Sequence, residues 1–355
     1  TLADRGKGYG IEARTIDGNN VIEVYKTVSK LAGDMRQNPK PVLLECMTFR
    51  RRGHEEASGT KYVPDELISY WERRDPVDRY EEFLLEENIL KQDAIDSIRA
   101  EFKQSIEEHL ESAHADQITT ADVASETGDV YSADMLEVHP PNAARSKMRF
   151  VDAIANALDV AMERHGNLVL MGQDIAEYGG VFKITEGLAD KYGLERVRNT
   201  PLCESAIVGT AIGLSIAGQK AMMEMQFADF VTCGFNQIVN NAAKLHYRWG
   251  QNVDVVIRMP TGGGVGAGPF HSQSNEGWFF QVPGLKIVYP STPQDAKGLL
   301  LAAFEDPNPI MFFEHKALYR NSTEDVPEGF FTVEIGKART VRSGDRASVI
   351  TYGMG

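Results

Sequence analysis

Short apolar runs and longer amphipathic stretches alternate along the second half of the chain. The short runs predict strands near residues 167–172, 220–225, 253–258, 285–289 and 310–313. The stretches between them predict helices, among them 149–165, 234–247 and 293–304. Strand–helix alternation at this spacing predicts an α/β fold with a parallel sheet wrapped by helices.

The first half of the chain predicts fewer strands and more helix. Residues 21–37 predict a helix, and the apolar run 41–49 has the continuous character of a buried parallel strand. The pattern becomes helical again from Pro64. Residues 91–114 predict a long amphipathic helix, and the core-like spacing of its apolar residues predicts a packed face: Ile95, Ile98, Phe102, Ile106 and Leu110.

The polar stretch 115–147 is the best domain boundary in the chain. Asp, Ser, Thr, Ala and Pro dominate it, which is typical of a linker or a loosely packed arm. Both ends of the chain predict a piece of a longer protein. It opens on Thr1 rather than Met, and its last run, 347–355, predicts a strand with nothing after it.

Composition and charge narrow the class of protein. The chain has 355 residues, 42% hydrophobic and 25% charged, which suits two or more globular domains. A formal net charge of -14 excludes the basic footprint of a nucleic-acid binder. Cys46, Cys203 and Cys233 lack disulfide or metal spacing, which favours a reducing cytoplasm. We expect no membrane partner, because no apolar run is long enough to span a bilayer.

One carboxylate stands out in the stretch Asn199-Thr-Pro-Leu-Cys-Glu-Ser-Ala-Ile-Val-Gly-Thr-Ala-Ile-Gly213. Pro201 fixes the approach to a helix that is predicted to begin near Glu204, and small residues along that helix allow another backbone or a ligand to come close. A helix N-terminus stabilises a carboxylate. Glu204 is therefore either a helix-capping glutamate of a packed helix or a residue that contacts a ligand.

Two loops carry further candidate chemistry. Arg50, Arg51 and Arg52 precede Gly53 and His54 at the end of the run 41–49, where α/β proteins bind ligands, so this loop is either an anion site or a solvated turn. The glycine-dense loop 262–268 leads to His271 and matches neither a Walker loop nor a dinucleotide fingerprint. It is either a close-approach loop or a plain connection.

Three motifs together resemble a known family. Asn199-Thr-Pro-Leu-Cys-Glu204, Glu224-Met-Gln-Phe-Ala-Asp229-Phe and His271-Ser-Gln-Ser resemble the β subunit of the thiamine-diphosphate-dependent decarboxylating component of 2-oxo acid dehydrogenase complexes, of the branched-chain (2-oxoisovalerate) type. The resemblance covers residues 149 to about 320. Met47-Thr-Phe-Arg50 and Gly53-His54 resemble the active-site loop of the α subunit of the same enzyme.

The resemblance implies a fused α–β polypeptide, truncated at both ends. Residues 1–114 would be the C-terminal part of the α-subunit-like (pyrophosphate) domain, and 115–147 a linker. Residues 148–325 would be the pyrimidine-binding domain of a thiamine-diphosphate-binding fold. Residues 326–355 would begin a domain similar to the transketolase C-terminal domain.

The resemblance also implies roles for single residues. Glu204 would bond a ring nitrogen of the aminopyrimidine and so activate the cofactor's thiazolium carbon. Leu202, Gln226 and Phe230 would line the aminopyrimidine pocket, with Phe230 in place of a common tyrosine. His271 would serve reductive acylation of a lipoyl group. His54 would lie near cofactor and substrate, and both histidines could move protons near neutral pH.

Metal sites are implied as well. The family's Gly-Asp-Gly…Asn motif for Mg²⁺ and diphosphate does not occur in this sequence, and the resemblance puts it upstream of Thr1. A structural potassium site of relatives matches the segments at Val253, Val255, Val256, Asp306 and Asn308, although one ligand position has become Ala303.

The implied function is oxidative decarboxylation of a branched-chain 2-oxo acid of the 3-methyl-2-oxobutanoate type. The acyl group would pass to the lipoyl-bearing acyltransferase core, and we expect a dimer of fused chains equivalent to α2β2. Glu55 stands where animal relatives carry a phosphorylated serine, so that switch is expected to be absent. Pyruvate or acetoin as substrate, a more distant transketolase-type enzyme and a non-catalytic assembly subunit are the alternatives.

Overall fold

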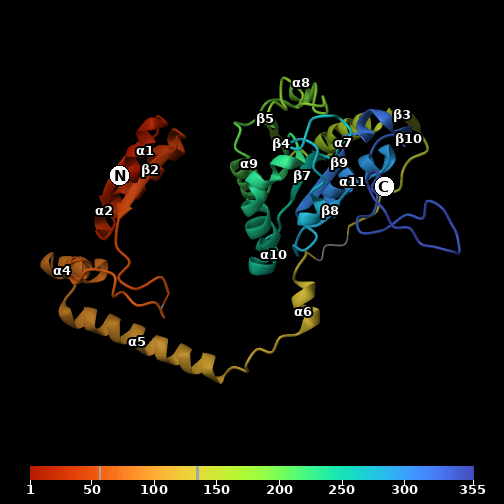
Figure 1. Cartoon of the computed structure of the whole chain (residues 1–355). Helices are drawn as coiled ribbons and strands as arrows, with labels where there is room; N and C mark the ends of the chain where they lie inside the picture. Colours follow the sequence, from red (N-terminus) through yellow and green to blue (C-terminus); the bar gives the residue numbers. More distant parts are fainter. Residues whose placement is uncertain (56, 133–135) are drawn as a thin grey trace. The chain divides into compact units, whose positions relative to one another are not determined.

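The computed structural model describes residues 1–55, 57–132 and 136–355, which form two compact units, Thr1–Thr119 and Thr120–Gly355 (Figure 1). The boundary falls inside the stretch 115–147 that we predicted as a linker, of which 133–135 lie outside the described residues. Other residues of this stretch make hydrogen bonds to the rest of the second unit. Helix α6 (Val123–Gly128) is tied there by the Tyr247 hydroxyl, which donates to Glu126, and the Ser132 N–H donates to Asn308 Oδ1 at 2.8 Å.

A six-stranded parallel sheet forms the centre of the second unit (Figure 1). Its order is β5-β4-β6-β7-β9-β8. The strands are β4 (Leu168–Gly172), β5 (Val197–Asn199), β6 (Lys220–Glu224), β7 (Val255–Thr261), β8 (Lys286–Val288) and β9 (Ile310–His315). Every residue of β4 and β7 is buried, as expected for strands covered on both faces. The predicted α/β fold is confirmed.

Helices cover both faces of this sheet and create two apolar cores. One core lies under α7 (Phe150–Arg164) and α11 (Pro293–Glu305) and includes Phe150, Leu158 and Phe312. The other lies under α9 (Glu204–Ile216) and α10 (Ala243–Trp249) and includes Val208, Met223 and Phe313. Alternate residues of a strand point to opposite faces, which is why Phe312 and Phe313 belong to different cores.

The single helix predicted for 234–247 is wrong in detail. The chain forms a 3₁₀ turn, η1 (Ala228–Gly234), then a π turn, η2 (Gln237–Ala242), and only then α10. The start of α10, directly after the π turn, lies against Gly284, where an added Cβ would lie 1.9 Å from the Ala243 carbonyl oxygen. Such widened turns occur often at functional sites, and this one follows the loop that we predicted to line a pocket.

Short elements complete the second unit. Strands β3 (Arg145–Arg149) and β10 (Thr323–Pro327) pair antiparallel, and α8 (Leu188–Tyr192) and α12 (Leu318–Asn321) fill connections. The strand predicted for 347–355 is not formed. Val349 and Ile350 are exposed there, because no neighbouring strand in the described residues pairs with them.

The first unit has a smaller sheet and more exposed apolar surface. Strands β1 (Glu12–Asp17) and β2 (Val42–Met47) pair in parallel. Around them lie α1 (Leu2–Gly8), α2 (Val21–Gln37), α3 (Asp65–Glu72), α4 (Pro76–Glu86) and α5 (Gln92–Ala115). The helix predicted for 21–37 is confirmed. The expectation that the run 41–49 is a buried strand is wrong for this unit, since no residue of β2 is fully buried.

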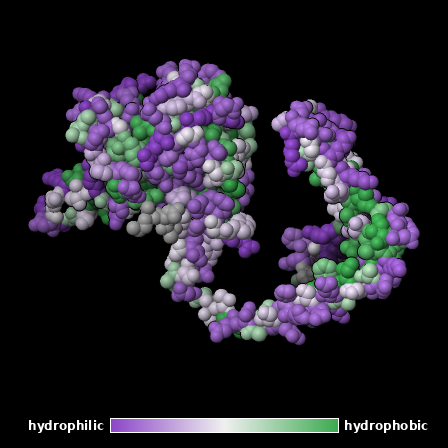
Figure 2. Space-filling view, turned by 180° about the vertical axis from the view of Figure 1, so that it is seen from behind, coloured by the Kyte–Doolittle hydropathy of each residue, from purple (hydrophilic) through white to green (hydrophobic). Residues whose placement is uncertain are grey.

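The apolar face of α5 also differs from its prediction. Ile95 is buried, but Ile98, Phe102, Ile106 and Leu110 keep between 43% and 67% of their surface exposed. Figure 2 shows green side chains gathered along this unit. The predicted amphipathic helix is present, and most of its apolar face has no cover among the described residues. No helix in the described parts of the chain is long and apolar enough to cross a membrane.

Candidate active site at the carboxyl edge of the sheet

The second unit places the predicted site residues along the edge where its parallel strands end. Gln173 follows β4, Gln226 follows β6, and the loop with His271 follows β7. The chain leaves β4 toward β5 on one side, and β6 lies on the other side of β4. This is a topological switch point, the place where ligands bind in open α/β sheets.

Glu204 is held at this switch point by the start of α9. It is the first residue of the helix and is 8% exposed. Gln173 Nε2 donates a hydrogen bond to Glu204 Oε1 at 3.1 Å. Backbone bonds fix the loop that delivers the carboxylate, because Thr200 N–H donates to the Gly172 carbonyl at 2.9 Å and Ala176 N–H donates to Asn199 Oδ1 at 2.8 Å. The structure therefore presents a buried carboxylate with a defined amide partner.

The other predicted pocket residues differ in their exposure. Leu202, in the loop just before α9, is 78% exposed, and Gln226 and Phe230 are half-buried. The turn η1 that carries Phe230 ends next to α9, since a Cβ on Gly234 would lie 3.6 Å from the Glu204 carbonyl oxygen. Leu202 is thus available to a ligand or a second chain, whereas Phe230 faces inward.

His271 packs edge-on against two aromatic rings. Its ring centroid lies 4.8 Å from that of Phe227 and 5.5 Å from that of Phe230, with the planes nearly perpendicular. The structure brings His271 and Phe230 together and places Glu204 against the other end of η1. Of the sequence-predicted residues, Phe230 therefore lies in this turn, and His271 and Glu204 lie against it.

The glycine-dense loop 262–268 lies very close to another side chain at its first residue, Gly262. Gly262 has φ +81°, and a Cβ there would lie 2.2 Å from His315 Nε2. Burial lowers the pKa of His315, and the neighbouring Lys316 ammonium acts in the same direction. A neutral imidazole therefore supports the start of the loop, and any larger residue at 262 would displace it.

A buried ion network lies beneath this edge. Arg258 of β7 forms ion pairs with Glu224 of β6 and Glu314 of β9, and the Tyr319 hydroxyl donates to Glu314 at 2.6 Å. Arg258 and Glu314 have no exposed surface. Burial raises the pKa of Glu224, and Arg258 opposes that shift. The network joins three neighbouring strands where the predicted site begins.

The residues predicted for potassium lie close together, with the Asp306 carboxylate already engaged. Asp306 Oδ2 accepts from Lys286 Nζ at 2.5 Å, and Oδ1 accepts from the Asn308 backbone and side-chain amides at 3.0 and 2.8 Å. Val253 N–H donates to the Pro307 carbonyl, and Val255 and Val256 lie in β7. A cation here would have to be bound by backbone carbonyls. Among the described residues, no group of three His, Cys, Asp or Glu side chains could hold a metal ion.

The first unit contains His54 in an exposed loop after β2. Arg51 beside it pairs with Glu72 at 3.1 Å and Asp75 at 3.0 Å, so this arginine is engaged within the unit. Gly53 is buried against Ser58, whose carbonyl oxygen would lie 2.2 Å from an added Cβ. The loop is therefore closed tightly on itself at the residue before His54.

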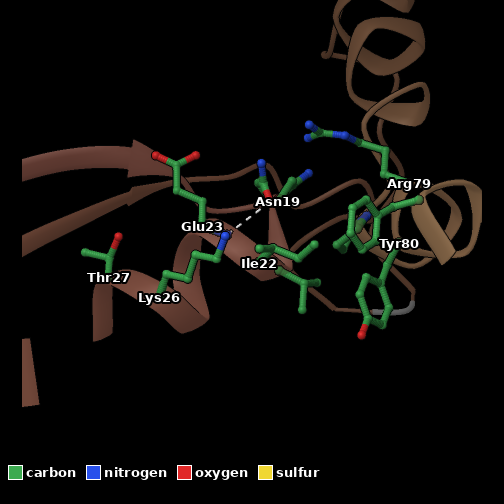
Figure 3. A pocket seen from close by; sticks show the side chains of 11 residues that line it. Asn19, Ile22, Glu23, Lys26, Thr27, Arg79 and Tyr80 are labelled. Atoms are coloured by element: carbon green, nitrogen blue, oxygen red, sulfur yellow. Dashed lines mark hydrogen bonds between the residues drawn. The ribbon is translucent and has the colours of Figure 1, made fainter. Parts of the chain in front are cut away.

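A cavity of about 500 Å³ also opens in the first unit (Figure 3). Its walls come from the start of α2 and from α4, and they include Asn19, Ile22, Glu23, Lys26, Thr27, Arg79 and Tyr80. Arg79 is engaged by Asp17 at 2.8 Å, and Asn19 donates to the Arg74 carbonyl. None of the residues predicted for chemistry lines this cavity.

Comparison with known proteins finds one family model for each of these two parts of the chain. Residues 146–322 match the family model of the transketolase pyrimidine-binding domain. These residues, which lie within the second unit, form a transketolase-type pyrimidine-binding domain. Residues 1–122 match the family model of the dehydrogenase E1 component.

Curated relatives of the pyrimidine-binding domain are β subunits of E1 enzymes. The 2-oxoisovalerate dehydrogenase β subunit of Bacillus subtilis (strain 168) is 49% identical over 211 residues, which is 59% of this chain and 64% of the relative. The mitochondrial β subunit of the same enzyme from Dictyostelium discoideum is 47% identical, with 59% and 57% covered. The pyruvate dehydrogenase E1 β subunit of Acholeplasma laidlawii is 46% identical, with 57% and 63% covered. The chain spans about three fifths of the length of these relatives.

Sequence reasoning missed three residues of the pyrimidine-binding domain that the structure brings to the site. Gln173 bonds Glu204, Asp229 bonds the backbone of the His271 loop, and Lys316 lies over the Phe227 ring. The signal for Gln173 was its place directly after a predicted strand. Asp229 lay inside a motif that we had quoted, and Lys316 directly follows β9.

Proposed function

We propose that this chain carries the aminopyrimidine half of a thiamine-diphosphate-dependent active site in a 2-oxo acid dehydrogenase. The observation that carries this proposal is Glu204, a buried carboxylate at the switch point of a pyrimidine-binding domain, with Gln173 as its partner. A carboxylate has about four acceptor positions. The bond from Gln173 therefore leaves room for a ring nitrogen of the cofactor.

The described residues fit that cofactor. Glu204 would hold the aminopyrimidine, oriented by Gln173 and by the N-terminus of α9. Leu202, Gln226 and Phe230 would line the ring pocket. When bound, thiamine diphosphate supplies the electron sink for loss of carbon dioxide. On the resemblance alone, we propose that Mg²⁺ accompanies the cofactor and that a potassium ion lies at the carbonyls around Val253.

His271 would serve the next step, acyl transfer to a lipoyl domain of the acyltransferase core. Its ring packs edge-on against Phe227 and Phe230, which limits its motion, and an imidazole can donate and accept protons. His54 of the first unit is proposed to approach cofactor and substrate from its own loop. An imidazole has one nitrogen that donates and one that accepts a proton, which suits proton transfer during these steps.

We propose a branched-chain 2-oxo acid of the 3-methyl-2-oxobutanoate type as the substrate. The wording of the motif Asn199-Thr-Pro-Leu-Cys-Glu204 supports this choice, as does the 49% identity to a 2-oxoisovalerate dehydrogenase β subunit. A 43% identity to the pyruvate dehydrogenase β subunit of Bacillus subtilis (strain 168) keeps pyruvate as the competitor. The test compares kcat/KM for 3-methyl-2-oxobutanoate, pyruvate and acetoin in the assembled full-length protein. A higher value for pyruvate or acetoin would contradict the substrate proposal.

The assembly is proposed to be a dimer of fused chains, α2β2-like. The outer side of α9 is exposed and bears small residues: Ser205, Ala206, Thr210 and Gly213. Small side chains allow close approach of another helix. Light scattering on the full-length protein should give the mass of a dimer, and a monomer would contradict the proposal.

A non-catalytic assembly subunit is the second candidate, and the exchange Glu204→Gln separates the two functions. An enzyme loses cofactor-dependent decarboxylation in this variant because the amide cannot replace the carboxylate toward the ring nitrogen. A scaffold assembles as before and has no activity to lose. The Glu177→Gln variant is the matched control, since Glu177 accepts a loop-fixing bond from Asn199 Nδ2 and a glutamine side chain keeps an oxygen that can accept it.

A further inference from the structure

The loop that carries His271 is fixed to the domain two residues later, at Gln273. The Gln273 carbonyl accepts from Gly262 N–H at 2.9 Å and from Thr261 Oγ1 at 3.0 Å. On the opposite side of the same residue, the Gln273 N–H donates to Asp229 Oδ1 at 3.1 Å. The backbone is thus held from β7 on one side and from η1 on the other.

Asp229 belongs to the turn that also holds the imidazole. Phe227 and Phe230 flank it in sequence and pack edge-on against His271. Asn275 Nδ2 donates to the Ala228 carbonyl at 2.7 Å and closes the same contact beyond Gln273. One short turn therefore fixes both the ring of His271 and the backbone that carries it.

The second oxygen of Asp229 is buried and has no hydrogen-bond partner among the described residues. An isolated buried carboxylate is costly, so a nearby cation is expected. Lys316 is a cation that lies near this turn. It is 4% exposed, its ammonium also has no partner among the described residues, and it lies 5.5 Å from the centre of the Phe227 ring.

Asp229 acts on Lys316 without forming a direct ion pair with it. Burial lowers the pKa of the Lys316 ammonium, and the Asp229 carboxylate acts against that shift. The Lys316 N–H donates to the Thr261 carbonyl at 3.0 Å, which ties the end of β9 to the strand that leads into the His271 loop. Asp229 and Lys316 thus lie at two different attachment points of the loop that carries His271.

We propose that Asp229 is a positioning residue for His271, acting through the N–H of Gln273, and that Lys316 is its counter-charge. This inference rests on the proposed function, in which His271 serves acyl transfer to the lipoyl group. Asp229 keeps the imidazole on Phe227 and Phe230, in the orientation that this step requires. Decarboxylation depends on Glu204 and not on this anchor.

The test compares two assays of the assembled full-length protein. One assay measures lipoyl-dependent acyl transfer, and the other measures decarboxylation with ferricyanide as an artificial electron acceptor. Asp229→Ala should lower kcat in the lipoyl assay at least tenfold more than it lowers the rate in the ferricyanide assay. Asp229→Asn keeps an acceptor for the Gln273 N–H and should recover most of the loss, whereas Lys316→Met should lie between wild type and Asp229→Ala.

Asp254→Ala is the matched control, because Asp254 pairs with Lys220 at 2.6 Å at the amino ends of the strands. It should change neither assay by more than twofold. Equal losses of Asp229→Ala in both assays would show a merely structural role and overturn the inference. An unchanged lipoyl assay would overturn it as well.

A second measurement separates this inference from the proposed function. The ring signals of His271 in a proton–carbon NMR spectrum report its contact with the two phenylalanine rings. Asp229→Ala should move these signals toward free-histidine values, while Asp254→Ala leaves them in place. If the protein shows no decarboxylase activity, the proposed function fails, and the NMR result still decides whether Asp229 positions His271. Unmoved signals would overturn the inference.

Discussion

Similar apolar patterns are buried in the second unit and largely exposed in the first. In the second unit, β7 is buried along its whole length and α7 packs its apolar face into a core. In the first unit, β2 has no fully buried residue, and most of the apolar face of α5 is exposed. The pattern shows which face of an element prefers to be covered. Only the neighbouring elements decide whether it is covered, and a six-stranded sheet with helices on both faces provides that cover within one unit.

The largest expected effect contrasts a buried ion network with an exposed one. Arg258→Met leaves Glu224 and Glu314 buried without their cation and should lower the free energy of unfolding of the second unit by about 3–5 kcal/mol. Arg99→Met removes the exposed pairs with Asp78 and Glu81 and should cause no measurable change. Urea denaturation measures both. A tolerated Arg258→Met would contradict the assigned network.

A matched leucine pair tests the two amphipathic helices. Leu158 in α7 has no exposed surface, and Leu158→Ala should cost about 3 kcal/mol through lost burial and a cavity. Leu110 in α5 is half exposed, and Leu110→Ala should cost less than about 0.5 kcal/mol. The measurement is again the free energy of unfolding in urea. Equal losses would show that the α5 face is covered in the folded protein, which would break the contrast between the units.

A smaller, pH-dependent effect is expected from a buried lysine of the second unit. Burial lowers the pKa of Lys297 to about 8, and its ammonium donates to the Pro327 carbonyl at 2.7 Å. Between pH 8 and the ordinary lysine value near 10.5, the unfolded chain binds more protons than the folded one, so stability should rise with pH by up to about 3 kcal/mol.

Lys297→Met removes this titration. Its free energy of unfolding should change less between pH 8 and 10 than that of the wild type, and it should exceed the wild-type value near pH 7. Denaturant titrations at each pH measure the difference. Parallel pH dependence in both proteins would show that Lys297 is not held with a lowered pKa.

The parallel sheet could be predicted because its main strands are continuous apolar runs. Strands β4, β6, β7, β8 and β9 lie within a few residues of their predicted positions. The strands β3 and β5 were missed, because Arg145–Arg149 is largely charged and Val197–Asn199 has one apolar residue. Periodicity cannot find a strand that is defined only by its hydrogen bonds.

The site was predictable where chemistry sits within one stretch of sequence. Glu204 could be found from the proline before it and the small residues after it. Gln173 and Lys316 could not be assigned, because each acts through a contact with a residue far away in the sequence. Gln173 contacts Glu204, which lies 31 residues away, and Lys316 contacts Phe227, which is farther still along the chain. The burial of the apolar face of α5 was predicted wrongly for the same reason. The spacing of apolar residues shows that a helix has an apolar face but not which element covers it.

The most direct test of the central claim measures deuterium exchange at the thiazolium carbon of thiamine diphosphate bound to the assembled full-length protein. This exchange needs no substrate and reports whether Glu204 activates the cofactor. The account predicts fast exchange in the wild type and in Glu177→Gln, and at least a hundredfold slower exchange in Glu204→Gln with the cofactor still bound. Equal exchange rates in Glu204→Gln and the wild type would contradict the account.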